Sequence, residues 1–335
     1  MKSKNISVLG GGSWGTVLAN LASSNTHNVT FWMRDSEVVE EVNKSKRNTK
    51  YLPGLKLKGN IIATNDISLI SNSEMIIFCI PSDSFREVSK LASEYIHESA
   101  QLITATKGVE KDKFTLMSQV LNEHMSNNPV GILSGPNLAQ EIATKQLSGT
   151  VIASKDKKLQ KNVIDIFGSD YFRVYENDDP YGVEMGGAIK NIYAIACGVA
   201  DGLDSGENTV GMIMTRGLGE MSRLAVELGA NPQTFLGLSG VGDLITTCAS
   251  PLSRNHKFGK YIGEGLSPQS ATNKIGQTVE GLKTLKVVKT LSDERKINMP
   301  IVDSLYKIIY KGENLDGSIQ NILGEDLIKD VEFFK

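Results

Sequence analysis

The sequence is poor in cysteine and histidine, and neither residue type falls in a metal-binding spacing. Its 335 residues include only three cysteines, Cys79, Cys197 and Cys248, which lie far apart and form no C-x-x-C pair. The four histidines show no ligand spacing either. An odd number of separated thiols argues against a disulfide framework or structural zinc and favours a reducing compartment. We therefore expect no bound metal and a cytoplasmic protein.

Long apolar runs, strong net charge and internal repeats are also missing. The longest apolar run, residues 192–200, is interrupted by Gly198 and is too short to span a bilayer. The formal net charge is -2, so no strong attraction to nucleic acid or to an anionic membrane is expected. No apolar signal segment precedes the first expected strand. These absences favour small-molecule partners, with no nucleic acid and no membrane span.

The composition is otherwise that of an ordinary globular protein, and one stretch carries a clear functional pattern. The chain is 40% hydrophobic and 22% charged, and its length suits two domains. Residues 4–15 read KNISVLGGGSWG, in which a short β-branched run predicts a buried strand. Gly10, Gly12 and Gly15 then form G-x-G-x-x-G, and residues 16–22 have helical spacing.

Glycine has a separate physical role at each position of this pattern. The first glycine allows a sharp turn, the second lets a pyrophosphate approach the backbone, and the third lets the helix pack against the strand. Free N–H groups at the helix start, aided by the helix dipole, then face the anion. The strand before the pattern and the helix after it favour a dinucleotide site over a glycine-rich turn without a ligand.

Strand and helix patterns alternate through the first half of the chain. Runs typical of strands occupy residues 6–9, 28–33, 61–64, 75–80, 101–106, 130–133, 149–153 and 171–175. Helical patterns occupy residues 36–44, 83–95, 138–144 and 158–167, with Asn137 as the expected N-cap of the third, and residues 48–58 are typical of a loop. The alternation predicts a doubly wound, mostly parallel sheet.

Two candidate site residues follow strands of this expected sheet. Arg34 and Asp35 come about 20 residues after the glycines, where Rossmann folds place the residue that reads the adenine ribose. An acid there favours NAD and an arginine accepts the 2′-phosphate of NADP, so both cofactors stay open. Lys107 follows the strand at 101–106, and ligands of open α/β sheets bind beyond the carboxyl ends of strands. An exposed loop lysine is the equally plain alternative.

After residue 179 the pattern changes to nearly all helix, which predicts a domain boundary there. The expected domains are residues 1–179 and residues 180–335. A long, small-residue-rich helix is predicted at 181–203, and Lys190 is one of its few charged residues. A desolvated lysine has a lowered pKa and can exchange protons near neutrality, as a general acid or base must. A structural lysine is the alternative.

Further along, polar residues suited to a phosphate follow a glycine-flanked carboxylate. Asp243 lies in the turn LSGVGDL, and Ser253, Arg254 and Asn255 come soon after it at an expected helix start. A guanidinium, a hydroxyl, an amide and free backbone N–H groups can together hold a phosphate. A plain helix cap with a surface arginine is the alternative.

Taken together, these motifs make the chain similar, over nearly its whole length, to NAD(P)-dependent glycerol-3-phosphate dehydrogenases of the bacterial type. The matching segments are GGGSWGT at 10–16, ATKG at 105–108, SGP at 134–136, GGAIKN at 186–191, TRGLGEMSR at 215–223, GVGDL at 240–244, SRN at 253–255 and IGQTVEG at 275–281. The resemblance implies a Rossmann-type domain followed by a helical domain like the C-terminal part of 6-phosphogluconate dehydrogenase.

The resemblance also implies the reaction and the roles of individual residues. The expected reaction is reversible reduction of dihydroxyacetone phosphate to sn-glycerol 3-phosphate with NAD(P)H, which supplies glycerophospholipid synthesis. Lys190 is the implied proton donor and acceptor at the substrate C2 oxygen. The implied substrate contacts are Lys107, Gly135, Asn137, Lys190, Asp243, Ser253, Arg254 and Asn255. The implied cofactor contacts are Gly10, Gly12, Ser13, Trp14, Gly15, Arg34, Tyr51, Lys107, Ala139, Arg254, Thr278 and Glu280.

Asn137 departs from the family pattern, which usually has serine or threonine at this position beside the substrate. The amide of Asn137 can still form a hydrogen bond, so we expect the contact to be kept. Two other functions remain open: a related dehydrogenase for a different hydroxy compound, and a dinucleotide sensor without catalysis. The sequence also leaves a homodimer open, because small-residue helices in the second half could form its interface.

Overall fold

The computed structural model describes residues 3–110 and 113–315 and divides the chain into two compact units. Unit 1 comprises Met1–Thr106 and Thr115–Pro180, and unit 2 comprises Lys107–Phe114 and the chain from Tyr181 on. The expected boundary after residue 179 therefore misses the short segment Lys107–Phe114, which packs with unit 2. The last part of the expected second domain, residues 316–335, lies outside the described residues.

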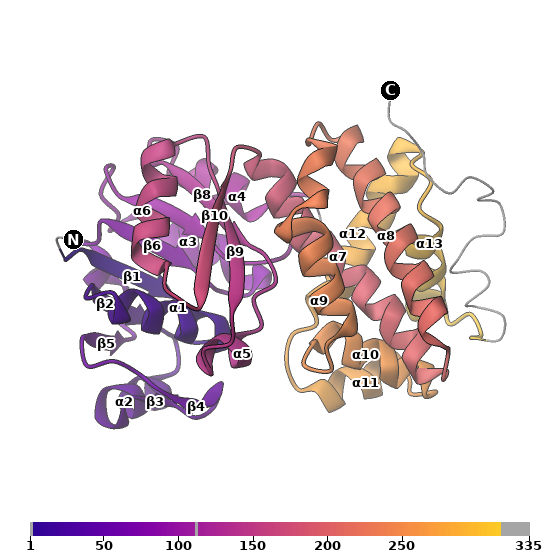
Figure 1. Ribbon diagram of the computed structural model, residues 1–335, viewed down its shortest axis with the longest axis horizontal. Coiled ribbons are helices and arrows are strands. Elements are labelled where there is room, and N and C mark those ends of the chain that lie inside the picture. Colours follow the sequence, from indigo (N-terminus) through magenta and orange to yellow (C-terminus); the bar gives the residue numbers. More distant parts are fainter. Residues whose placement is uncertain (1–2, 111–112, 316–335) are drawn as a thin grey trace. The chain divides into compact units, whose positions relative to one another are not determined.

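Unit 1 is built on an eight-stranded sheet with the strand order β10-β9-β8-β7-β6-β1-β2-β5 (Figure 1). The strands are β1 (Asn5–Leu9), β2 (Asn28–Trp32), β5 (Ile61–Thr64), β6 (Met75–Phe78), β7 (Gln101–Thr104), β8 (Val130–Ser134), β9 (Ser148–Ala153) and β10 (Phe172–Asn177). Neighbouring strands are parallel except for the antiparallel pair β8–β9. The predicted mostly parallel sheet is confirmed.

Helices cover both faces of this sheet, because successive strand residues point to opposite sides. Val8 packs into one apolar core with residues of α1 (Ser13–Ser24), α2 (Ser36–Ser45), α5 (Ala139–Ala143) and α6 (Lys157–Phe167). Its neighbour Leu9 packs into a second core with the short helix η1 (Ile67–Ile70), α3 (Ser82–Ser93) and α4 (Met117–His124). The two cores make unit 1 a doubly wound α/β fold.

The expected loop at 48–58 is instead a small antiparallel hairpin. It consists of β3 (Arg47–Asn48) and β4 (Leu52–Lys56), with Asn48 opposite Leu52. Asn48 and Leu52 are buried, whereas Pro53 and Gly54 are exposed. The Pro-Gly pair suggested a loop, but it lies at the edge of a two-stranded ribbon that the buried side chains hold against the rest of unit 1.

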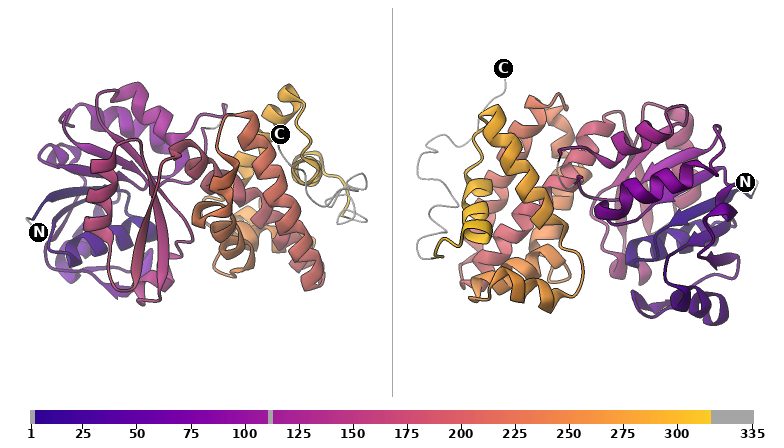
Figure 2. Two further views of the ribbon diagram at one scale, coloured as in Figure 1. Left: turned by 45° about the horizontal axis from the view of Figure 1, so that its top comes forward. Right: turned by 180° about the vertical axis from the view of Figure 1, so that it is seen from behind.

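Unit 2 is helical, and its helices can be followed from further sides in Figure 2. They are α7 (Pro180–Gly202), α8 (Glu207–Glu227), η2 (Pro232–Leu236), η3 (Leu238–Gly242), α9 (Asp243–Ala249), α10 (Arg254–Gly263), α11 (Pro268–Ile275), α12 (Glu280–Arg295), α13 (Pro300–Tyr306) and η4 (Lys307–Lys311). Every residue of α7 from Gly182 to Ala200 is buried. Among the described residues, no helix has the length and hydropathy that crossing a membrane requires.

Glycines bring α7 and α10 into backbone contact. A Cβ atom on Gly259 of α10 would lie 2.0 Å from the carbonyl oxygen of Ile195, and one on Gly198 of α7 would lie 2.0 Å from that of His256. No side chain larger than hydrogen fits at either position without moving a helix. This close packing fixes the start of α10 relative to the helix that carries Lys190.

Candidate active site

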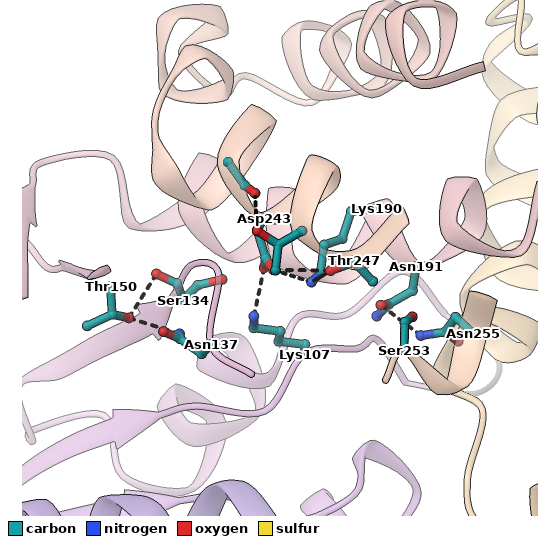
Figure 3. A network of polar contacts seen from close by, with 12 residues as sticks. Lys107, Ser134, Asn137, Thr150, Lys190, Asn191, Asp243, Thr247, Ser253 and Asn255 are labelled. Carbon is teal, nitrogen blue, oxygen red and sulfur yellow. Dashed lines mark hydrogen bonds and ion pairs between the residues drawn. The ribbon is translucent and has the colours of Figure 1, made fainter. Parts of the chain in front are cut away.

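Two lysines of unit 2 share one buried carboxylate (Figure 3). Asp243, the first residue of α9, accepts a hydrogen bond from Lys107 Nζ at 2.7 Å through Oδ2. Its other oxygen, Oδ1, accepts from Lys190 Nζ. The structure thus brings together three of the residues predicted from sequence, although they are far apart in the chain.

Burial prepares Lys190 for proton exchange near neutrality. The side chains of Lys190 and Asp243 are 5% and 2% exposed. Burial lowers the pKa of Lys190 to about 8, the Asp243 carboxylate pulls it upward, and the nearby Lys107 ammonium adds to the lowering. With two cations around one anion, the cluster carries net positive charge when both lysines are protonated. It is therefore suited to stabilise a negative oxygen.

Thr247 belongs to this cluster but was missed from the sequence. Its hydroxyl accepts a hydrogen bond from Lys190 Nζ and lies 3.3 Å from Asp243 Oδ1, to which it can donate. The stretch around Asp243 was read as a turn, whereas η3 leads directly into α9. Residues four apart on a helix face the same side. The spacing Asp-x-x-x-Thr could have identified Thr247 if the helix had been recognised.

The start of α10 offers donors for an anion. Ser253 is the N-cap, and its Oγ accepts from the N–H of His256 at 3.2 Å. Within the described chain, the N–H groups of Arg254 and Asn255 have no hydrogen-bond partner. The exposed Arg254 reaches Gln277 Oε1 at 3.4 Å. A helix N-terminus with free N–H groups, a hydroxyl and a guanidinium can hold a phosphate.

The side chain of Asn255 is already engaged within the protein. Its Nδ2 donates to Asn191 Oδ1 at 2.9 Å, and its Oδ1 accepts from the N–H of Gly281 at 3.0 Å. Asn191, which follows Lys190, was not among the predicted site residues. Because Nδ2 and Oδ1 of Asn255 are both bonded within the protein, its backbone N–H is the group left for the predicted substrate contact.

Two predicted cofactor contacts lie at the start of α12. Glu280, the first residue of α12, pairs with Lys283 at 3.7 Å, and Thr278, just before the helix, is exposed.

The glycine-rich turn of unit 1 separates packing roles from a ligand role. Gly10 has φ +120°, and a Cβ there would lie 2.4 Å from the carbonyl oxygen of Cys79. A Cβ on Gly15 would lie 2.0 Å from the carbonyl oxygen of Gly10. A Cβ on Gly12 would meet no protein atom within 4 Å. Protein packing therefore explains Gly10 and Gly15 but not Gly12, where the open space suits a pyrophosphate.

Other donors at this turn also fit a dinucleotide. Gly12 is the N-cap of α1 and supplies no side-chain cap, so the first N–H groups of the helix face outward. The indole Nε1 of Trp14 is buried, and no residue in the described part of the chain hydrogen-bonds to it. Ser13 Oγ donates to the carbonyl oxygen of Tyr51 at 2.7 Å, which brings the predicted cofactor contact Tyr51 next to the turn.

At the end of β2, the two candidates for reading the ribose differ in how they are engaged. The Asp35 carboxylate accepts from the N–H groups of Glu37 and Val38 at 3.1 and 3.4 Å. It also pairs with Lys50 at 2.7 Å, and this hydrogen bond lowers the pKa of Asp35. Arg34 is exposed. The acid is thus occupied as a helix cap, whereas the guanidinium points into solvent.

The predicted residues after β8 form a separate polar group in unit 1 (Figure 3). Asn137 does not cap the following helix as expected: the N-cap of α5 is Leu138, and Asn137 Nδ2 instead donates to Thr150 Oγ1 at 3.0 Å. The amide oxygen of Asn137 and the hydroxyl of Ser134 are buried and have no hydrogen-bond partner among the residues that the structure describes. Gly135 has φ +148°, and Ala139 is the first residue of α5. Two unpaired polar atoms fit a further ligand contact here.

Comparisons with known proteins agree along the whole chain. The family described as NAD-dependent glycerol-3-phosphate dehydrogenase N-terminus matches residues 5–160, and the corresponding C-terminus family matches residues 179–320. Glycerol-3-phosphate dehydrogenase [NAD(P)+] of Alcanivorax borkumensis is 46% identical over 98% of this chain and 96% of its own length. That of Acinetobacter baylyi is 49% identical over 92% and 86%.

Solved structures point the same way. The crystal structure of glycerol-3-phosphate dehydrogenase from Coxiella burnetii is 34% identical, has a TM-score of 0.92, and is matched over 96% of this chain and 99% of its own. Glycerol-3-phosphate dehydrogenase from Saccharomyces cerevisiae is 27% identical with a TM-score of 0.85, over 97% of this chain and 100% of its own.

Proposed function

Because the chain belongs to the NAD-dependent glycerol-3-phosphate dehydrogenase family, we propose that it reduces dihydroxyacetone phosphate to sn-glycerol 3-phosphate with NAD(P)H. The reaction is reversible, and its product is a precursor of glycerophospholipids. The observation that supports this most strongly is the buried cluster of Lys190, Asp243 and Lys107, in which burial lowers the pKa of Lys190 to about 8.

In this proposal each residue of the cluster has a defined task. Lys190 donates its proton to the C2 oxygen as the ketone is reduced and accepts it back in the reverse reaction. Lys107 adds a second positive charge that stabilises the growing negative charge on that oxygen. Asp243 holds both ammonium groups in place, and Thr247 completes the hydrogen bonds of Lys190.

The substrate phosphate is held apart from the reacting carbon. The N–H groups at the start of α10, the Ser253 hydroxyl and the Arg254 guanidinium bind it, which fixes C2 for reaction. In unit 1, Gly12, Ser13 and the start of α1 would hold the cofactor pyrophosphate, with Arg34 at the ribose. The bound cofactor supplies the hydride, and the protein supplies position and charge.

Replacement of Lys190 tests this assignment. The Lys190→Met variant should lose turnover by orders of magnitude while it still binds NAD(P)H, because only the proton donor is removed. Loss of nicotinamide absorbance with dihydroxyacetone phosphate measures turnover, and cofactor fluorescence measures binding. Lys289→Met is the control, since Lys289 pairs with Asp293 and Asp303 outside the cluster. Near-normal turnover of Lys190→Met would refute the role.

The same assay decides between the remaining functions. If wild-type protein binds NAD(P)H but reduces a different phosphorylated or carboxylated carbonyl compound, it is a related dehydrogenase. If it binds the cofactor and turns over no candidate substrate, it is a dinucleotide sensor. A homodimer and a cytoplasmic location stay predictions, the second resting on the cysteine pattern of the sequence.

A further inference from the structure

The hairpin β3–β4 holds the glycine-rich turn through one buried amide. Asn48 is 0% exposed, and its Nδ2 donates to the carbonyl oxygen of Gly11 and to Oγ1 of Thr16, both at 2.8 Å. Thr16 Oγ1 in turn donates to the carbonyl oxygen of Gly12 at 2.8 Å. One side chain therefore contacts the Gly11 carbonyl directly and the Gly12 carbonyl through the Thr16 hydroxyl, and the Gly12 carbonyl also accepts the N–H of Thr16 at 2.9 Å.

Restraining these carbonyls also sets the direction of the next N–H groups. A trans peptide is planar, and its N–H points opposite to its C=O. The Gly11 carbonyl shares a peptide plane with the N–H of Gly12, and the Gly12 carbonyl shares one with the N–H of Ser13. These two N–H groups have no hydrogen-bond partner among the described residues. The Gly12 N–H therefore points away from the Asn48 amide, and the Ser13 N–H points away from Thr16. A Cβ on Gly12 would meet no described protein atom within 4 Å.

The hairpin holds the turn at a second point as well. Ser13 Oγ donates to the backbone carbonyl of Tyr51 at 2.7 Å, three residues after Asn48 in the chain. This bond fixes the first residue of α1. The bonds at Gly11 and at Ser13 tie both ends of this short stretch to residues 48–51, which limits rotation of its peptide planes.

The bonding of Asn48 differs from that of a residue kept for stability alone. Its Oδ1 is buried and has no hydrogen-bond partner in the described chain. A buried polar atom without a partner is unfavourable in the folded state. The amide is thus held only through its donors, and both of these contact the glycine-rich turn and the helix that follows it.

We propose that Asn48 is a positioning residue for the cofactor, which acts through Thr16 to aim the N–H groups of Gly12 and Ser13 at the pyrophosphate. Nothing in the sequence patterns or in the assigned site residues gives Asn48 or Thr16 this role. The proposal rests on the proposed function only in taking the ligand to be a dinucleotide. Pre-orienting the turn strengthens binding because the bound geometry does not have to be ordered on association.

Two buried asparagines of unit 1 provide a matched test. Asn128 also holds a loop through Nδ2, which donates to the carbonyls of His97, Glu98 and Ala100 at 2.9, 3.1 and 2.8 Å. Asn48→Ala should raise the dissociation constant of NADPH, measured by fluorescence titration without substrate, by about tenfold or more. Asn128→Ala should lower the unfolding temperature comparably but change that constant by less than about twofold.

A second pair of variants covers the case in which Asn48→Ala does not fold. Thr16→Val removes the hydroxyl that passes the restraint to Gly12, whereas Thr16→Ser keeps it. We expect weaker NADPH binding in Thr16→Val and near-normal binding in Thr16→Ser. In both Asn48→Ala and Thr16→Val, the KM for the cofactor should rise while kcat and the KM for dihydroxyacetone phosphate stay close to wild type.

The outcomes separate this proposal from the proposed function. Equal weakening of NADPH binding in the Asn48 and Asn128 variants, or unchanged binding in Asn48→Ala and Thr16→Val, would overturn the positioning role. Wild-type protein that binds NADPH but does not reduce dihydroxyacetone phosphate would refute the proposed reaction and leave the binding comparison valid.

Discussion

Lys190 shows how one side chain can combine packing with chemistry. It lies on the fully buried part of α7, so its charge is poorly solvated, and it retains that charge near neutrality because Asp243 and Thr247 hydrogen-bond to it. Burial and pairing act in opposite directions on its pKa, and burial prevails, giving a value of about 8.

This pKa predicts opposite pH dependences for the two directions of the reaction. Reduction needs the protonated amine, so its rate should fall about tenfold for each pH unit above about 8. Oxidation of glycerol 3-phosphate needs the neutral amine, so its rate should rise up to about pH 8 and then level. Steady-state profiles in both directions measure this, and a reduction rate that stays constant up to about pH 10 would contradict it.

The glycines of the turn allow a comparison of ligand and packing roles. Gly12→Ala places a methyl group in open space, so the unfolding temperature without ligand should stay unchanged while NADPH affinity falls by about tenfold or more. Gly15→Ala forces a Cβ against the carbonyl oxygen of Gly10 and should lower the unfolding temperature itself. Thermal unfolding and cofactor titration measure both; unchanged NADPH affinity in Gly12→Ala would mean that the open space holds no pyrophosphate.

Sequence patterns predicted residues that lie in a recognisable local motif. They missed residues whose role depends on helix boundaries or on contacts with distant parts of the chain. The strand-turn-helix context predicted Gly12 as a cofactor contact. The charge on an apolar helix left a structural Lys190 open, and only the resemblance to a known family predicted it as the proton donor. Thr247 was missed because α9 was not recognised, so its one-turn spacing from Asp243 had no meaning. Asn48 was missed because residues 48–58 look like a loop, and its hydrogen bonds to Gly11 and Thr16 span more than 30 residues of chain.

At the scale of elements, the α7–α10 contact positions the two ends of the proposed substrate site. The first helix carries Lys190 and the second begins at Arg254, and glycines bring their backbones together. Helices that meet through glycine leave no side chain between them to repack. The distance from proton donor to phosphate site is therefore set by backbone geometry.

Substitution of a contact glycine should therefore be costly where substitution of a glycine with open space at its Cβ is not. Gly259→Ala drives a methyl group into the Ile195 carbonyl and should destabilise the protein by about 1–3 kcal/mol. Gly211→Ala, within α8 and with no atom within 4 Å of the new Cβ, should stabilise it by up to about 1 kcal/mol through helix propensity. Denaturant unfolding measures both, and similar effects of the two variants would argue against a tight crossing.

At the scale of the whole molecule, each unit has its own core. The predicted contacts to cofactor and substrate are divided between the two units. At a given concentration, a ligand that binds only the folded chain stabilises it more the tighter it binds, with the logarithm of the ratio of ligand concentration to dissociation constant. Asp35 is engaged by the start of α2 and by Lys50, which leaves Arg34 as the charged group exposed after β2. The molecule should therefore prefer the cofactor that carries a 2′-phosphate.

Thermal unfolding with equal concentrations of the two cofactors tests this preference. NADPH should raise the unfolding temperature more than NADH, because the Arg34 guanidinium pairs with the extra phosphate. In Arg34→Gln the difference should shrink or vanish, with little change for NADH. A larger shift with NADH in the wild-type protein would show that the acid, not the arginine, reads the ribose.

The short segment Lys107–Phe114 leaves the strand order of unit 1 and packs with the helices of unit 2. Lys107 therefore belongs to the same unit as Asp243 and Lys190. In the proposed reaction, the three charged side chains that would act on the substrate oxygen therefore all come from unit 2.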